Sequence, residues 1–451
     1  MDLSMDDQVL MGLGIESVRI QEENFEILTP GACVTLQADG VLNVRQRIGA
    51  ERKLLSCRFP AHLSPWRLAR HTPFRCVLEG NGLSLTIQGD SVLIFKPHRH
   101  QRLTFEGYFK PHYAQETRGN RLLLDPSGGC GFFGIPPRIT EVENLDQECW
   151  NLSAHLARFD ELWVSVCPPR PRDREKYYQS IAHEGSGGDE GPYPSNERIR
   201  GTAKHCRIFT VHSGWTIDAP QWAENPPGAH YTHPMPDLTD RSVPADPVEF
   251  ARVRDEARRL GMKFIPYLSP YYSNSPDIFA EMERVLKEYE VDGLYFDGWC
   301  GKRDDFRPGY YLMRRARAIL GDRILYLHSS SEPFGNGLVT LPFVFAYADY
   351  VLSGESSRFG LELNEFLRYA VSGYQISNAA GVWCHYGSWS DEPGYHFDVP
   401  STEHIEMALR NHVQLWRQAQ IWSKSPEELA RFDREYYDGL DQLREEVGGK
   451  G

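Results

Sequence analysis

From Glu161 onward, the chain alternates short apolar runs with amphipathic segments of about a dozen residues. The runs have the composition of buried strands, and the segments between them have the apolar spacing of surface helices. Strands that alternate with helices form a parallel sheet, because each helix carries the chain back to the start of the next strand. Seven strands are expected, at 161–169, 206–215, 262–272, 291–299, 322–332, 348–357 and 379–387.

The number of strands predicts an α/β fold built on a (β/α)8 TIM barrel rather than an open doubly wound sheet. We expect the catalytic barrel to occupy 161–425, although the sequence indicates no eighth strand. The segment 402–422 has the pattern of one long amphipathic helix. The last stretch, 426–451, is predicted to be a highly charged helical tail.

The first 160 residues differ, because short β-type runs there are separated by turn residues. The stretches 34–48, 74–95 and 102–109 have the composition of strands and hairpins. Asp39-Gly40 and Gly89-Asp90 provide the backbone freedom that tight turns need. Such a series of hairpins predicts an N-terminal antiparallel β-sandwich domain over 1–160, with little catalytic content.

The charge of the chain argues against two classes of partner. The net charge is −13, and no cluster of basic residues offers a footprint for nucleic acid or for an anionic membrane. No apolar run reaches the roughly 18 residues of a membrane span. A neutral or locally recognised substrate fits better, and a homo-oligomer is left open.

The nine cysteines are scattered along the chain and form no CxxC pair. This pattern indicates reduced thiols rather than a disulfide framework or a zinc site. The N-terminal stretch contains acids where a secretory signal has basic residues. We therefore expect a cytoplasmic protein.

Three carboxylates stand where neighbouring predicted strands end. The stretch 291–299, VDGLYFDGW, runs from apolar residues into Asp297, and Glu332 and Glu355 follow the next two strands. A single Asp before Gly more often caps a helix or closes a turn. Acids at the carboxyl ends of adjacent barrel strands, however, converge on one pocket. Glycoside hydrolysis needs such a set, because one carboxyl protonates the leaving oxygen while another attacks the anomeric carbon or activates water.

Aromatic and histidine side chains gather around the same strand ends. Sugar rings stack on aromatic rings while their hydroxyls bind polar neighbours, although about half of the aromatic residues are expected to pack in the core or under loops instead. His212 and His328, at their strand ends, are expected to bind substrate hydroxyls or to hold a carboxylate in place. Arg303 follows the same strand as Asp297. It would select an acidic substrate if it pointed inward, or pair with Asp304 and Asp305 at the surface. The candidate substrate-binding residues are Trp215, His212, Tyr267, Tyr272, Trp299, His328, Arg303, Trp383 and Trp389.

The sequence indicates neither a metal nor a cofactor. His230 and His233 lack a third ligand at a recognisable spacing, and no HExxH motif is present. The Gly-rich stretch 184–197 lacks the GK[ST] ending of a phosphate-binding loop. We therefore expect catalysis by carboxylates alone.

The stretch VDGLYFDGW resembles the nucleophile segment on the fourth barrel strand of α-galactosidase-like and α-fucosidase-like glycoside hydrolases. A β-sandwich before the barrel also recurs among the α-galactosidase relatives. The resemblance implies a retaining, exo-acting enzyme for an α-linked sugar, with Asp297 as the nucleophile. It places the general acid/base after the sixth strand, where Glu355 stands, with Glu332 as the substitute. The chain departs from these relatives in having Glu rather than Asp there, and no C-terminal β-domain is predicted.

Other functions stay open at this point. A non-catalytic carbohydrate-binding protein on a barrel scaffold accounts for the aromatic residues but not for the acids. A metal-dependent hydrolase would use the loop histidines, and a lyase acting on uronates would use Arg303 and the tyrosines. The acids at several strand ends favour the glycoside hydrolase.

Overall fold

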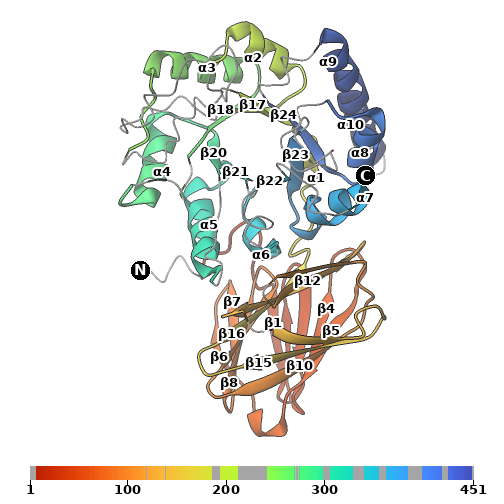
Figure 1. Cartoon of the computed structure of the whole chain (residues 1–451). Helices are drawn as coiled ribbons and strands as arrows, with labels where there is room; N and C mark the ends of the chain where they lie inside the picture. The colour runs from red at the N-terminus through yellow and green to blue at the C-terminus, as the bar shows by residue number, and fades with distance from the viewer. Residues whose placement is uncertain are drawn as a thin grey trace.

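The computed structural model shows two bodies, one rich in β-strands and one that mixes strands with helices (Figure 1). The β-rich body contains the N-terminal strands and lies below the mixed body in that view. The structure describes residues 7–117, 119–137, 139–184, 193–211, 241–268, 270, 273, 275–297, 305–328, 340–354, 362–383, 399–418 and 425–448.

The β-rich body consists of two eight-stranded antiparallel sheets whose inner faces share one core. One sheet has the spatial order β1 (Ser17–Gln21), β2 (Asn24–Leu28), β3 (Ala32–Leu36), β4 (Val41–Gln46), β5 (Arg52–Arg58), β10 (Gln101–Gly107), β15 (Trp150–Leu156), β14 (Ile139–Glu143). The other has the order β11 (Tyr113–Thr117), β12 (Asn120–Asp125), β13 (Gly128–Ile135), β16 (Glu161–Cys167), β9 (Val92–Pro97), β8 (Leu83–Gln88), β7 (Arg75–Gly80), β6 (Arg67–His71). The expected antiparallel sandwich is confirmed.

Strand β16 corrects one expectation, because it lies in the sandwich and does not open the parallel sheet. It pairs antiparallel with β13 on one side and with β9 on the other. All of its residues are buried, since one face packs in the sandwich core and the other face packs against the mixed body. A fully buried strand has the same sequence pattern in either setting. The sandwich therefore extends to Cys167, past the expected boundary at residue 160.

The mixed body is built on eight parallel strands. Their spatial order is β19 (Lys263–Pro266), β18 (Ile208–Val211), β17 (Ile181–Glu184), β24 (Gln414–Gln418), β23 (Ala379–Trp383), β22 (Tyr350–Gly354), β21 (Ile324–His328), β20 (Gly293–Phe296). The outer strands, β19 and β20, are joined by one isolated parallel bridge between Tyr267 and Tyr295 and by a 2.8 Å hydrogen bond from the Leu268 amide to the Tyr295 carbonyl. A continuous ladder does not cross this seam, so a closed barrel stays a prediction.

Helices cover the outside of the parallel sheet (Figure 1). They are α1 (Arg174–Tyr177), α2 (Asn196–Ala203), α3 (Pro247–Arg259), α4 (Ile278–Glu288), α5 (Arg307–Leu320), α6 (Pro342–Phe345), α7 (Leu363–Glu365), α8 (Thr402–Arg410), α9 (Pro426–Phe432) and α10 (Gly439–Gly448). Helix α3 shows how their starts are fixed, because the Asp246 carboxylate accepts hydrogen bonds from the amides of Val248 and Glu249. None of the helices in the described ranges combines the length and the apolar character that a membrane crossing requires.

Two of the eight strands, β17 and β24, lie in segments whose sequence pattern, over 174–183 and 402–422, predicts helices. The expected helix 402–422 ends early, because α8 stops at Asn411 and His412 adopts a positive φ of 53°. In the strand that follows, Trp416 faces the sheet interior and Leu415 faces the C-terminal helices. An eighth strand is therefore present, and the first strand is β17.

Aromatic side chains join the two bodies. Trp163 of β16 meets Phe306 and Tyr310 edge-on, with ring centroids 5.1 and 5.3 Å apart. The hydroxyls of Tyr310 and Tyr347 donate hydrogen bonds of 2.6 and 2.9 Å to Asp90 Oδ2 in the sandwich. The interface between the two bodies therefore buries these aromatic rings together with the hydrogen-bonded Oδ2 atom of Asp90. Since these side chains come from both bodies, the sandwich and the parallel sheet are packed as neighbours.

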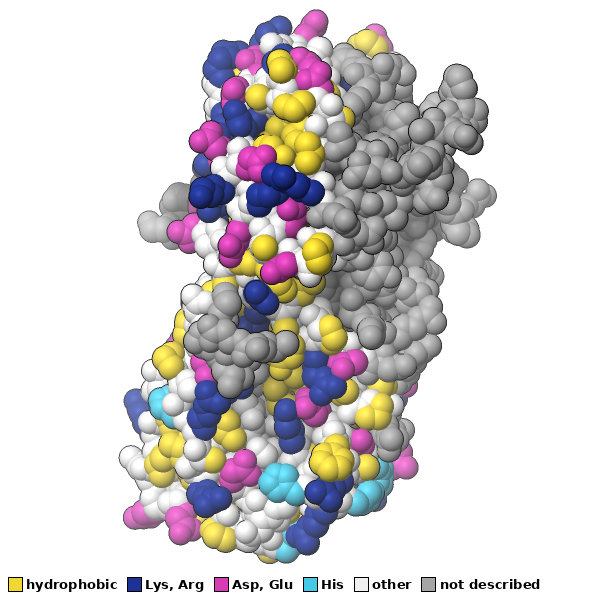
Figure 2. Space-filling model, turned by 90° about the vertical axis from the view of Figure 1, so that its left-hand side faces the viewer, with side chains coloured by type: hydrophobic (Ala, Val, Ile, Leu, Met, Phe, Trp, Pro, Cys, Tyr) yellow, Lys and Arg dark blue, Asp and Glu magenta, His cyan; other side chains and the backbone are white. Residues whose placement is uncertain are grey.

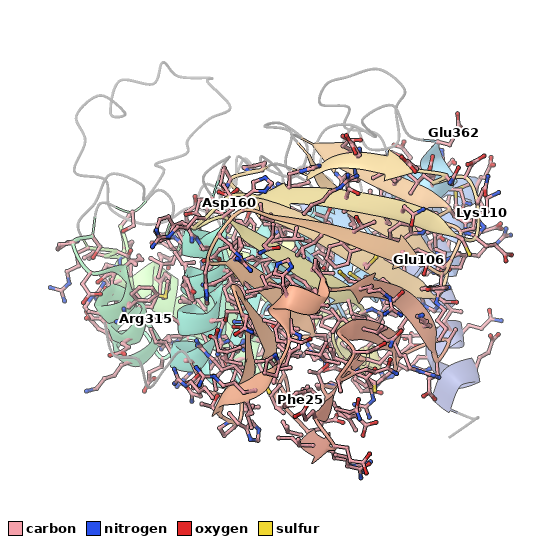
Figure 3. All side chains as sticks on the ribbon, turned by 90° about the horizontal axis from the view of Figure 1, so that it is seen from below. Phe25, Glu106, Lys110, Asp160, Arg315 and Glu362 are labelled. Atoms are coloured by element: carbon pink, nitrogen blue, oxygen red, sulfur yellow. The ribbon has the colours of Figure 1, made fainter. Side chains whose placement is uncertain are left out.

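The surface carries charges of both signs. On the face shown in Figure 2, acidic and basic side chains are interspersed over both bodies. At helix α4, for example, the exposed Glu288 pairs with Arg284 and with Arg241. In the view from below, Figure 3 places Glu106 on the sandwich strands and Arg315 on the green helices of the mixed body. The face in Figure 2 therefore lacks, among its described residues, the single-sign field that attracts nucleic acid.

Candidate functional site

Strand β20 brings Asp297 to the carboxyl end of the parallel sheet. Leu294 and Phe296 are buried on the helix side of the strand, whereas Tyr295 faces the interior. Because successive side chains of a strand point to opposite faces, Asp297 falls on the same face as Tyr295. The predicted position of Asp297 at a strand end is confirmed. Enzymes built on parallel sheets hold their reactive groups at this end.

Among the described residues, His328 and Tyr267 contact the Asp297 carboxylate. The His328 Nδ1 atom lies 2.6 Å from Oδ1, and the Tyr267 hydroxyl donates a longer hydrogen bond of 3.4 Å to Oδ2. The strand register explains the first contact, since Phe296 pairs with Leu327 and the next residues along each strand are Asp297 and His328. The His328 side chain is 3% exposed and that of Asp297 is 15% exposed. The carboxylate is therefore sheltered but still reachable.

A layer of aromatic side chains lies directly below this pair. The rings of Tyr295 and Tyr326 stack with centroids 4.5 Å apart, and the Tyr295 hydroxyl lies 3.1 Å from His328 Nδ1. The Tyr326 hydroxyl lies 2.5 Å from His183 Nε2, and Trp416 meets Tyr326 edge-on at 5.2 Å. All these residues are buried. This layer of the sheet interior therefore combines aromatic rings with hydrogen-bonded polar atoms directly below Asp297 and His328.

The surroundings of Asp297 favour its negatively charged form. Hydrogen bonds donated to a carboxylate stabilise the ion, and His328 donates one when it carries its proton on Nδ1. The assignment of that proton follows from the 2.6 Å contact with the carboxylate. A charged, reachable carboxylate can attack an electrophilic carbon or accept a proton, whereas a general acid has to hold a proton.

Most of the other predicted site residues lie outside the described residues. They are Trp215, His212, Tyr272, Trp299, Arg303, Glu332, Glu355 and Trp389. Trp383 is the last residue of β23, and its side chain is also outside the described part. The structure brings together the remaining three, Asp297, Tyr267 and His328. It gives both candidate sugar ligands among them a direct contact with the carboxylate.

Three buried residues of this site were missed by sequence reasoning. Tyr295 and Tyr326 stand two positions before Asp297 and His328, so strand alternation could have placed them directly below. His183 was missed because its segment has the pattern of a short helix, whereas it lies on strand β17. Within the described ranges, no three His, Cys, Asp or Glu side chains are grouped as ligands of a metal ion.

A second charged cluster lies at the amino end of β22, away from Asp297. Asp349 Oδ1 lies 2.5 Å from Lys176 Nζ, and its Oδ2 lies 2.5 Å from an Arg317 nitrogen and 2.7 Å from the Leu325 amide. Burial disfavours the charge of Asp349, but Arg317 and Lys176 outweigh that effect and hold the pKa of the carboxyl below its ordinary value. A cluster at the amino end of such a sheet contributes to stability rather than to chemistry.

Comparisons with known proteins give no family. No protein-family model matches the chain, and no curated protein matches it. Among solved structures, the chain is similar to a GH31 family sulfoquinovosidase from E. rectale, with 10% identity, 94% of this chain and 83% of that chain covered, and a TM-score of 0.44.

Two further similarities cover less of the chain. A GH18 chitinase from Flavobacterium johnsoniae has 11% identity, with 58% of this chain and 94% of that chain covered and a TM-score of 0.36. A dihydrodipicolinate synthase from Agrobacterium tumefaciens has 10% identity, with 61% and 80% covered and a TM-score of 0.34. At these values the similarities carry no argument about function, which rests on the residues of this chain.

Proposed function

We propose that the chain is a glycoside hydrolase in which Asp297 is the nucleophile and Glu355 the general acid/base, with Glu332 as the substitute for the second role. One observation carries the proposal: the Asp297 carboxylate lies at the carboxyl end of a parallel sheet, held by His328 and Tyr267. The (β/α)8 barrel, with the β19–β20 seam closed, is part of the same proposal.

The order of the strands supports a second carboxylate nearby. Strands β20, β21 and β22 are consecutive neighbours in the sheet, and Glu332 and Glu355 follow the second and third of them in sequence. Adjacent strands lie about 4.8 Å apart, so the axes of β20 and β22 are separated by about 10 Å or less where the sheet curves. Retaining glycosidases use carboxylates about 5–5.5 Å apart and inverting ones about 6.5–9.5 Å apart. The spacing of the strands suits either case.

The contacts of Asp297 support the role of nucleophile rather than that of general acid. A nucleophile has to be ionised when the substrate binds, and Asp297 faces hydrogen-bond donors from His328 and Tyr267. The acid that protonates the leaving oxygen has to be the other carboxyl. This division gives a retaining mechanism through a covalent glycosyl ester on Asp297, which water then hydrolyses. We propose an exo-acting enzyme for an α-linked sugar, in a cytoplasmic protein.

Azide rescue tests the proposal. An Asp297→Gly variant lacks the nucleophile, and its turnover of an activated aryl glycoside should fall to background. Added azide should restore turnover and yield a glycosyl azide of opposite anomeric configuration, because azide attacks from the face that the carboxylate used. The exposed Asp322→Gly substitution at the other end of the sheet is the control.

Other outcomes would point elsewhere. Turnover close to the wild-type rate in Asp297→Asn would contradict the assignment. Sugar binding without turnover by the wild-type chain would favour the non-catalytic carbohydrate-binding protein. Loss of activity on chelation, restored by one added metal ion, would favour the metal-dependent hydrolase.

A further inference from the structure

A side-chain hydrogen bond crosses the interior of the parallel sheet. The Tyr326 hydroxyl, on β21, lies 2.5 Å from His183 Nε2, on β17. In the spatial order of the eight strands, β17 and β21 stand four places apart. Backbone ladders connect only adjacent strands, so this contact links two strands that have no backbone hydrogen bonds to each other.

His183 also supports the stacked tyrosine pair. Its ring meets Tyr295 edge-on at 5.1 Å and 88°, and it meets Tyr326 at 5.1 Å and 77°. The two tyrosine rings stack 4.5 Å apart, and all three residues are buried. Close-packed interiors leave such rings few alternative positions. A substitution of His183 should therefore affect the positions of both tyrosine rings.

The tyrosine pair leads to the carboxylate. The Tyr295 hydroxyl lies 3.1 Å from His328 Nδ1, and the same nitrogen lies 2.6 Å from Asp297 Oδ1. Because one nitrogen meets both oxygens, the place of the Tyr295 hydroxyl affects how the imidazole faces the carboxylate. The five side chains form one continuous column from β17 to the end of β20.

We infer that His183 is a positioning residue for Asp297, acting through Tyr326 and Tyr295 on His328. The inference rests on the proposed catalytic role of Asp297. An apolar interior would pack without burying an imidazole and two phenols, whose polar atoms are costly unless they are hydrogen-bonded. The hydrogen bonds of the polar groups fix the orientation of His328 beside Asp297. This orientation matters because catalysis is sensitive to displacements of about 1 Å.

Two substitutions at one position separate the hydrogen bond from the packing. The amide nitrogen of Gln can take the place of Nε2, whereas Asn is too short to reach the Tyr326 hydroxyl. His183→Gln should keep kcat within about threefold of the wild-type value, and His183→Asn should lower kcat about ten- to a hundredfold with KM nearly unchanged. Tyr326→Phe should match His183→Asn, and the double variant should lose little more than either single variant.

Thr210→Val is the matched control. Thr210 is buried and pairs with His183 in the ladder between β17 and β18, but it lies outside the column. The NMR signals of labelled histidine rings supply a measurement that does not depend on turnover. The His328 signals should shift in His183→Asn and in Tyr326→Phe and keep their positions in Thr210→Val.

Three results would overturn the inference: equal kcat losses in His183→Gln and His183→Asn, additive losses in the double variant, or unchanged His328 signals in His183→Asn. If His183→Asn does not fold, Tyr326→Phe decides on the same measurements. The proposed function fails separately, through full turnover in Asp297→Asn, and the His328 signals still show in that case whether His183 influences the Asp297–His328 pair.

Discussion

The hydroxyl of Tyr310 donates a 2.6 Å hydrogen bond to Asp90 Oδ2 and so ties helix α5 to the sandwich. Burial raises the pKa of the Asp90 carboxyl, while the Arg314 charge and the hydroxyls of Tyr310 and Tyr347 act in the opposite direction. These donors therefore offset part of the cost of burying the Asp90 carboxyl between the two bodies. Removal of one of these donors should lower the free energy of unfolding by a measurable amount.

Tyr310→Phe should lower the free energy of unfolding by about 1–2 kcal/mol, because it removes one hydrogen bond to a buried carboxylate while the ring keeps its contact with Trp163. Urea denaturation at neutral pH measures this loss. The control is Tyr311→Phe, at the neighbouring position, where the side chain is 46% exposed. Equal stability of the two variants would contradict a structural role for the Asp90 contact.

Asp349→Asn should cost about 3 kcal/mol of stability near pH 7, because the buried Arg317 loses its carboxylate partner and Lys176 keeps only its longer 3.4 Å contact with Asp173. The pKa of Asp349 is lower in the folded protein than in the unfolded chain. Its contribution is therefore fully present above the unfolded value of about 3.9 and is lost as the pH falls below it. Urea midpoints between pH 6 and 3 should fall less steeply in the variant, with exposed Asp322→Asn as the control.

His412 should make the protein less stable in mild acid. Burial lowers its pKa to about 4, with further lowering by the charges of Arg172, Arg368 and Arg174. The unfolded chain binds the proton near pH 6.5, so stability is complete above that pH and is lost as the pH falls from about 6.5 to about 4. The loss by pH 5 should amount to about 1 kcal/mol, after allowance for partial exposure.

His412→Asn should flatten this pH dependence while preserving the fold, because Asn tolerates the positive φ of 53° at that position. Free energies of unfolding at pH 7 and pH 5 test the expectation. The exposed His62→Asn variant should keep the wild-type slope. A slope as steep in His412→Asn as in the wild type would show that another group is responsible.

The two contacts of Asp297 should differ in their effect on turnover. The 2.6 Å contact with His328 is much shorter than the 3.4 Å hydrogen bond from Tyr267. His328→Ala should lower kcat/KM about a hundredfold or more and Tyr267→Phe less than about tenfold. His328→Asn should recover part of the activity, because its amide nitrogen can take the place of Nδ1. The reverse ranking in steady-state kinetics would contradict the geometry.

The parallel sheet could be predicted from the sequence because its middle strands have clear boundaries. Six strands, β18 to β23, lie where the apolar runs predict them. Strand β17 was missed because it closely follows a four-residue helix, and the two together have the pattern of one short helix over 174–183. Strand β24 was missed because Trp416 and Leu415 face different neighbours, and single-sequence spacing does not distinguish that pattern from a helix in a short window.

The candidate site could be predicted only in part. Asp297 was identified because an apolar strand that ends on an acid has a recognisable pattern. His328 was predicted to bind a substrate hydroxyl or to hold a carboxylate in place, and the structure shows it beside the Asp297 carboxylate. Which carboxylate it contacts depends on a register that the sequence does not specify. His183 depends on a contact across the sheet, between residues 143 positions apart in the chain. The roles of Glu332 and Glu355 stay predictions.

Strand β20 is held unevenly by its neighbours. Four residue pairs join it to β21, whereas one isolated bridge and two backbone hydrogen bonds, from the Leu268 amide to the Tyr295 carbonyl and from the Asp292 amide to the Phe264 carbonyl, join it to β19. The pairing of Phe296 with Leu327 places Asp297 and His328 side by side on the continuous edge. Tyr267 reaches the same carboxylate across the less continuous seam, where its hydroxyl lies 3.4 Å from Oδ2. The acid and its imidazole therefore depend on one strand pairing, and the contact with Tyr267 depends on another.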